Sequence, residues 1–292
     1  MSVTPIPAAR EQHSYWRTFR YHLAGEPLGI AGFILVAVVV LAVIFAPYLS
    51  AYEPGAISIR ERFASPGMSH LLGTDHLGRD LFARMLYGGR AALLVALSAT
   101  TISLIIGIVL GLISGYAPQW LDNVLLVVFD TIKSFPTVML ALAYVSLFGA
   151  SAEAIITIVV LVSAPAYARI VRTQTLSLKS SEFIIAERSM GAGSMRILFI
   201  HILPNVIGPV LILASMDIPV VIGIEAGMSF LGLGMPPSIP SWGSMLNDGF
   251  TYIRETPWPA IAGGLPIIVA TLGFTFLGEA MRDIFDPRSK SR

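Results

Sequence analysis

The sequence contains no cysteine and few charged residues. Without cysteine, a disulfide framework, a thiolate metal site and thiol catalysis are all excluded. Charged residues make up 13% of the 292 residues, against roughly 25% in soluble domains. The net charge is only +1 and no basic block is present, which excludes a nucleic-acid binder. The hydrophobic content of 55% also excludes a disordered chain.

Long stretches without any charged residue fill most of the chain. A helix needs about 20 apolar residues to cross a bilayer, and most of these stretches reach that length. Their apolar residues are continuous rather than alternating, which indicates helices and not membrane strands. We therefore predict an all-α integral membrane protein with six transmembrane helices, at about 28–49, 91–116, 121–148, 154–169, 206–230 and 258–277.

The placement of lysine and arginine predicts the orientation of these helices. With both termini in the cytoplasm, 13 of the 19 basic residues lie on the cytoplasmic side, as the positive-inside rule requires. Five arginines in the first outer loop oppose the rule, but four acidic residues offset them. The predicted parts are a cytoplasmic tail (1–27), a first transmembrane helix (28–50), an extracytoplasmic loop (51–90), a five-helix core (91–281) that contains a cytoplasmic loop (170–203), and a cytoplasmic tail (282–292).

The cytoplasmic loop holds two helical stretches separated by a glycine. Residues 182–190 can form a helix that Gly191 ends in the left-handed conformation. We expect a second helical stretch, 194–200, to end before Pro204. Composition alone favours an ordinary basic loop, but the order of its residues indicates a docking surface.

This order resembles the "EAA" loop of ABC-importer permeases, which reads Glu-Ala-Ala, three residues, Gly, nine residues, Ile, one residue, Leu-Pro. The chain departs from the pattern at three positions, where Ile185 replaces Glu, Glu187 replaces the second Ala, and His201 replaces Ile. The positions that match are Ala186, Gly191, Leu203 and Pro204.

Further segments resemble the dipeptide, oligopeptide and nickel branch of these permeases, and most closely its C-type subunits. Together they cover nearly the whole chain: 16–48, 70–90 (HLLGTDHLGRDLFARMLYGGR), 115–136, 201–205 (HILPN), 229–234 (SFLGLG), 240–243 (PSWG) and 282–288 (RDIFDPR). The resemblance implies the type I importer permease fold in a bacterial cytoplasmic membrane. It also implies transport of di- or oligopeptides by alternating access, although close relatives transport nickel or glutathione.

The same resemblance implies four kinds of partner: a B-type permease, two ABC ATPases, an extracytoplasmic binding protein and membrane lipid. The ATPases would bind ATP and Mg²⁺, and no cofactor or metal is expected in this chain. Indeed, none of its three lysines follows a glycine, as a P-loop requires. We therefore expect a transport subunit and not an enzyme. Its ATPase-coupling residues would be Glu182, Ala186, Glu187, Arg188, Gly191, Ala192, Arg196, His201, Leu203 and Pro204, with Glu182 or Glu187 supplying the missing acidic group.

Among the acidic residues inside the predicted helices, Asp217 lies near mid-membrane and Glu225 near the outer end of the fifth helix. Acids at membrane depth mark transport pathways, so both are candidates to line one. The alternative for Asp217 is a structural hydrogen bond to a neighbouring helix. Such acids would also suit an ion-coupled transporter, although no internal repeat is evident. A membrane scaffold without transport activity would not need them.

The outer motif GTDHLGRD (73–80) has two interpretations. With the histidine three residues before it, it offers two histidines and two carboxylates to a metal such as zinc or nickel. In the structural interpretation, which we favour, Asp75 turns the chain and Asp80 pairs with Arg79 or Arg84.

Two spacings predict contacts within the membrane helices. Gly107, Gly111 and Gly115 recur every four residues, which allows two helices to approach closely. Asp130 and Lys133 are three residues apart on one helical face, so we expect them to neutralise each other.

The predicted orientation can be tested with single cysteines, because the chain has none. Ser69→Cys should react with a membrane-impermeant thiol reagent added outside intact cells, and Ser194→Cys should react only after the membrane is opened. The opposite labelling pattern would overturn the assignment drawn from the distribution of basic residues.

Overall fold

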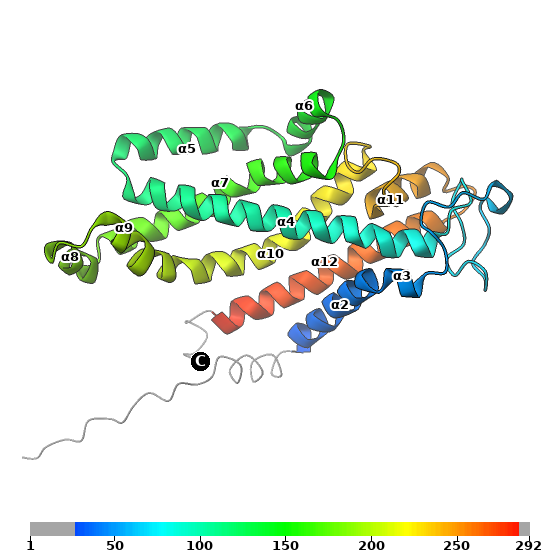
Figure 1. Cartoon of the computed structure of the whole chain (residues 1–292), viewed down its shortest axis with the longest axis horizontal. Helices are drawn as coiled ribbons and strands as arrows, with labels where there is room; N and C mark the ends of the chain where they lie inside the picture. The colour runs from blue at the N-terminus through cyan, green and yellow to red at the C-terminus, as the bar shows by residue number, and fades with distance from the viewer. Residues whose placement is uncertain (1–26, 286–292) are drawn as a thin grey trace, which may run out of the picture.

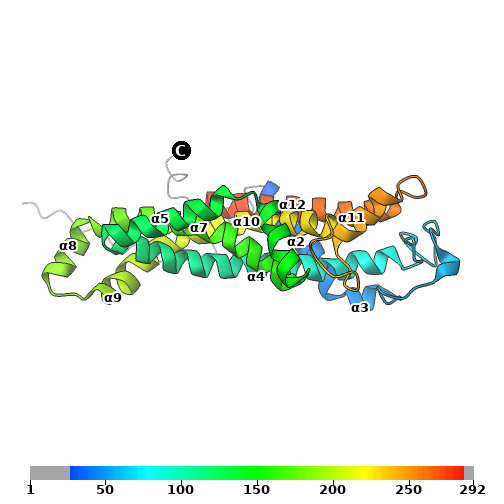
Figure 2. The same ribbon diagram turned by 90° about the horizontal axis from the view of Figure 1, so that it is seen from above.

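The computed structural model describes residues 27–285 as an elongated bundle of helices that run roughly along one axis (Figure 1). The outer loop and α11 lie at one end, and α8 and α9 lie at the other, in both views (Figure 2). Among residues 27–285 the only strand-like pairing is a single bridge between Thr74 and Asp80. The helices are α2 (Pro27–Ile44), α3 (Ala46–Leu49), η1 (Ile59–Glu61), α4 (Leu81–Tyr116), α5 (Gln119–Ser134), α6 (Thr137–Phe148), α7 (Ala152–Lys179), α8 (Glu182–Ser189), α9 (Ser194–Arg196), the π-helix η2 (Ile197–Ile202), α10 (Leu203–Phe230), α11 (Trp242–Thr251) and α12 (Trp258–Phe285).

Five helical segments are long and apolar enough to cross a membrane, and α5 with α6 makes a sixth if the pair is one broken span. The all-α prediction is confirmed. The prediction of an unbroken third helix is wrong, because the chain turns by 87° between α5 and α6. Phe135 at the bend is extended (φ −83°, ψ 130°), since the ring of Pro136 disfavours a helical conformation at the residue before it.

Two helices continue beyond their predicted ends. Helix α4 begins at Leu81, so the last ten residues of the predicted loop 51–90 are helical. The Asp80 carboxylate caps this helix by accepting a hydrogen bond from the Ala83 backbone N–H at 2.7 Å. Helix α7 likewise runs to Lys179 instead of ending near 169. Both predicted helix ends were placed at charged residues, where the apolar stretch stops. A helix continues beyond the lipid, however, as long as its backbone hydrogen bonds continue.

The loop predicted to be cytoplasmic (170–203) is helical almost throughout. Helix α8 and the left-handed Gly191 (φ +87°) appear as predicted. The expected break before Pro204 is wrong, because α9, η2 and α10 follow one another without a turn. Pro204 is the second residue of α10, which directly follows the π-helix η2, where the hydrogen-bonding pattern of the helix changes.

Helices α4 and α7 approach each other through glycine. A Cβ added to Gly107 would lie 2.3 Å from the Cβ of Tyr167. One added to Gly111 would lie 2.5 Å from the carbonyl oxygen of Ala168, and Gly115 is equally crowded by α7. The predicted close packing is confirmed, and it lies within this chain.

Matched glycine substitutions test the seam between α4 and α7. Gly111→Ala should force the helices apart and destabilise the purified protein by about 1–3 kcal/mol, as overpacking does. Gly223→Ala, in α10 with open space around it, should be neutral or slightly stabilising. Thermal unfolding in detergent measures both. Equal melting temperatures for the two variants would contradict the seam.

Candidate functional site

Helix α8 projects from the end of the bundle opposite the outer loop (Figure 1). Ile184 is its one buried side chain and lies in a cluster that includes Leu112 of α4, Val171 of α7 and Val206 of α10. A single apolar side chain thus ties α8 into the core where α7 and η2 meet it.

Tyr116, the last residue of α4, makes a second connection to α8. Arg188 of α8 donates a hydrogen bond to the Tyr116 hydroxyl at 3.3 Å, and its guanidinium lies over the ring. Lys179 of α7 donates to the Tyr116 carbonyl oxygen at 3.0 Å and also lies over the ring. Tyr116 therefore holds the ends of α4 and α7 and the helix α8 together.

Ion pairs join α5 to α7 behind this junction. Arg172 donates two hydrogen bonds to the carboxylate of Asp122, one to each oxygen, both at 2.5 Å. Nearer the middle of the bundle, Asp130 pairs with Arg169. The expected pairing of Asp130 with Lys133 is therefore replaced by a pairing between helices, because α7 runs alongside α5 and brings an arginine within reach.

The tip of the loop predicted to be cytoplasmic exposes apolar side chains. Ile185 is exposed at the position where the EAA pattern has Glu, and Met190 is 75% exposed; Phe183 and Met195 are also exposed. Several exposed apolar side chains on a projecting segment are typical of a contact with another protein.

The residues predicted to couple this loop take different places. Glu187 is half-buried, with a carboxylate oxygen 3.6 Å from Nε2 of His201, whereas Glu182 is exposed at the start of α8. Glu182 is therefore better placed than Glu187 to reach a partner. Of the other predicted residues, Ala186, Arg188, Gly191, Arg196 and Pro204 are exposed, and Ala192 and Leu203 are partly buried.

The two membrane acids differ in surroundings. Asp217 of α10 is partly exposed and accepts a hydrogen bond from the Tyr167 hydroxyl of α7 at 2.7 Å. Glu225 is fully buried and accepts one from the Ser229 hydroxyl at 2.8 Å. Ser229 in turn accepts from the backbone N–H of Met235, so this arrangement supports the end of α10. Of these two residues, only Asp217 is partly exposed.

The outer loop is tied by Asp75, which turns the chain as expected. One of its oxygens accepts hydrogen bonds from the backbone N–H groups of Leu77 and Arg79, and the other lies 2.6 Å from Nε of Arg79. The expected pairing of Asp80 with an arginine is wrong. As the N-cap of α4, Asp80 faces backbone N–H groups, and its second oxygen contacts Nδ1 of His70 at 2.8 Å.

The structure separates the four residues of the metal interpretation, because His70 binds Asp80 while Asp75 binds Arg79. A different set, Asp75, His76 and Asp248, has ligand atoms within 4.8 Å of one another. However, Arg79 also lies 3.5 Å from Asp248, so a guanidinium already links the two acids. Burial raises the pKa of Asp248, and the cations around it oppose this shift. The chemistry is that of an ion-pair network and not of a metal centre.

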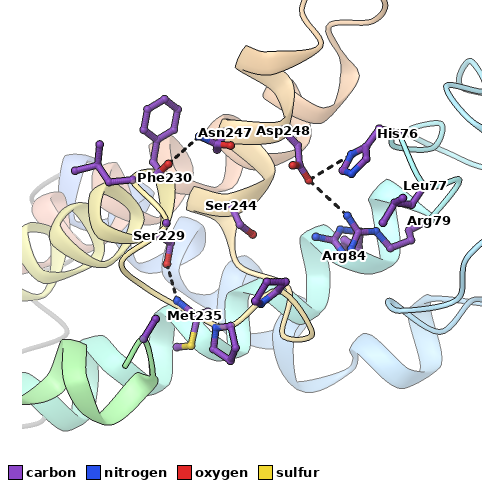
Figure 3. A pocket seen from close by; sticks show the side chains of 15 residues that line it. His76, Leu77, Arg79, Arg84, Ser229, Phe230, Met235, Ser244, Asn247 and Asp248 are labelled. Carbon is purple, nitrogen blue, oxygen red and sulfur yellow. Dashed lines mark hydrogen bonds and ion pairs between the residues drawn. The ribbon is translucent and has the colours of Figure 1, made fainter. Parts of the chain in front are cut away.

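A cavity of about 650 Å³ opens between this network and the end of α10 (Figure 3). Its lining includes the polar residues Arg84, Asn247 and Asp248 and the apolar residues Leu231 and Met235. Sequence reasoning missed this cavity. The feature of the sequence that could have indicated it is the glycine- and proline-rich segment 229–243, which connects α10 to α11 and supplies part of the lining.

The family profile described as binding-protein-dependent transport system inner membrane component matches residues 107–291. The chain belongs to this family. A second profile, the N-terminal transmembrane domain of oligopeptide transport permease C, matches residues 14–66. The protein is thus a multi-pass inner-membrane permease with the type I importer fold, and the resemblance found in the sequence is confirmed.

Named relatives of this permease cover nearly the whole chain. A dipeptide transport system permease protein of Alkalihalophilus pseudofirmus is 37% identical over 95% of this chain and 91% of the relative. A glutathione transport system permease protein of Pectobacterium atrosepticum is 35% identical over 100% of this chain and 97% of the relative. A putative peptide transport system permease protein of Brucella suis is 36% identical over 89% of this chain and 87% of the relative.

Proposed function

We propose that this permease carries di- or oligopeptides into the bacterial cytoplasm by alternating access. Two of the three relatives are named for dipeptides or peptides, and the third is named for glutathione, itself a small peptide. A nickel substrate finds no support at the outer cavity, because Arg79 already links the carboxylates that would attract a cation.

The observation that carries the proposal is the exposed apolar tip of α8. ATPase partners, and not this chain, bind ATP and Mg²⁺, since the sequence lacks a P-loop. One ATPase would contact the tip around Ile185 and Met190, and Glu182 would supply the acidic group. Movement of α8 would then reach α4, α7 and α10 through Ile184 and Tyr116.

A second permease subunit would cover the face of α5. Asp130 and Arg169 pair there with side chains 68% and 41% exposed. Charged groups within transmembrane helices face a bundle interior or water and not lipid, because their exposure to lipid is costly. The pathway would therefore run between α5 and the partner permease, with both termini of this chain in the cytoplasm.

Reconstitution tests this function. The permease, its B-type partner and both ATPases are placed in vesicles, with binding protein outside and ATP inside, and uptake of labelled trialanine is measured. The proposal requires uptake that depends on ATP without any ion gradient. Uptake that follows an imposed proton or sodium gradient and ignores ATP would favour the ion-coupled alternative.

The turn after α8 should be essential for coupling. Gly191→Pro should abolish uptake, because proline fixes φ near −65° whereas Gly191 needs +87°. Gly193→Ala is the matched control, since Gly193 has φ −71° and open space around it. Normal ATP-dependent uptake by Gly191→Pro, at equal assembly with the ATPases, would refute the role of α8.

Asp217 would provide a negative site for the ammonium group of a peptide. Asp217→Asn keeps the hydrogen bond from Tyr167 but removes the charge. Uptake of trialanine should therefore fall more than uptake of N-acetyl-trialanine in the same vesicles. If the ratio of the two uptake rates is the same in wild type and variant, Asp217 has only the structural role.

A further inference from the structure

Arg84 is a buried cation whose partners do not satisfy it. Its side chain is 4% exposed, and its Nε lies 3.6 Å from the nearest oxygen of Asp75, beyond hydrogen-bond distance. Among the described residues, Nε has no hydrogen-bond partner. A buried guanidinium without hydrogen-bonded anions is unfavourable, so this position calls for an anion.

The neighbouring acids are already engaged by another arginine. Arg79 holds Asp75 at 2.6 Å and lies 3.5 Å from Asp248. Nδ1 of His76 lies 3.9 Å from the same Asp248 carboxylate (Figure 3). Both acids therefore have a closer cation than Arg84, which leaves the Arg84 guanidinium available to a ligand.

The cavity beside Arg84 has the size and lining of a ligand site. Its volume of about 650 Å³ lies within the range of roughly 300–1,000 Å³ that small-molecule sites occupy. Met235 lines the cavity at a distance from the two arginines and comes from a segment far from Arg84 in sequence (Figure 3). Leu231 adds a further apolar side chain to the lining. A ligand with a carboxylate at one end and an apolar group at the other would contact both Arg84 and these apolar residues.

We propose that this cavity binds a carboxylate-bearing solute, with the Arg84 guanidinium donating to the carboxylate. The planar fork of arginine matches a carboxylate with two parallel hydrogen bonds, and lysine does not. The inference rests on the proposed function, in which the ligand is a peptide and the carboxylate its C-terminus. The cavity lies at the outer end of the bundle, so the peptide would occupy it before entering the membrane.

Protection of a cysteine in the cavity tests this site. Ser244→Cys is a near-isosteric change at a lining position in a chain without other cysteines. In the reconstituted importer, trialanine should slow the reaction of this cysteine with an impermeant maleimide. Trialanine amide, which lacks the carboxylate, should need at least about tenfold more peptide for the same protection, because hydrogen bonds between charged groups are lost.

Arginine variants test whether the difference between trialanine and trialanine amide depends on Arg84. Adding Arg84→Gln or Arg84→Lys to Ser244→Cys should remove the tenfold difference between acid and amide. Arg60→Gln, which removes an exposed outer arginine away from the cavity lining, should preserve it.

Three results would overturn the site: equal protection by acid and amide in the Ser244→Cys protein, a difference that survives Arg84→Gln, or a cysteine that never reacts from outside. The comparison of acid with amide needs no change at Arg84, so it stands even if the Arg84 variants fail to assemble. Any of these results in an importer that still takes up trialanine refutes the site alone. Absence of trialanine uptake refutes the proposed function instead.

Discussion

The close contact between α4 and α7 is the constraint on which the rest of the structure depends. Because Gly107, Gly111 and Gly115 carry no side chains, α4 and α7 meet with their backbones close together. This places the end of α4 beside the basic segment of α7, where Tyr116 can contact Lys179 and α8. Without the seam, α8 would have no fixed base.

The bundle has distinct tasks at its two ends. At the end that holds α8, Ile184 and Tyr116 attach this short helix to α4, α7 and η2, so a displacement of α8 would be passed to long helices of the bundle. At the outer end, Asp75 and Arg79 tie the loop before α4 to α11 and leave Arg84 facing a cavity. In the proposed transport cycle, movement of α8 at one end of the bundle opens and closes a path that begins at the cavity at the other end.

Much of this arrangement could be predicted from the sequence, because hydrophobic length and glycine spacing are local signals. They located the membrane helices, the seam and the turn at Gly191. The sequence could not show which cation meets which acid: Asp130 binds Arg169 across helices, and Asp75, not Asp80, binds the arginine. Such pairs depend on helix neighbours and on cap geometry. The cavity was missed for the same reason, since Arg84 and Met235, which both line it, lie more than a hundred residues apart in sequence.

Photo-cross-linking from the tip of α8 tests the central claim most directly. A photoreactive residue replacing Met190, which is 75% exposed, should form an adduct with an ATPase subunit in the assembled importer. The same residue replacing Met68, 99% exposed on the outer loop, should form none. An importer in which Met68 captures an ATPase and Met190 does not would contradict both the orientation and the coupling role of α8.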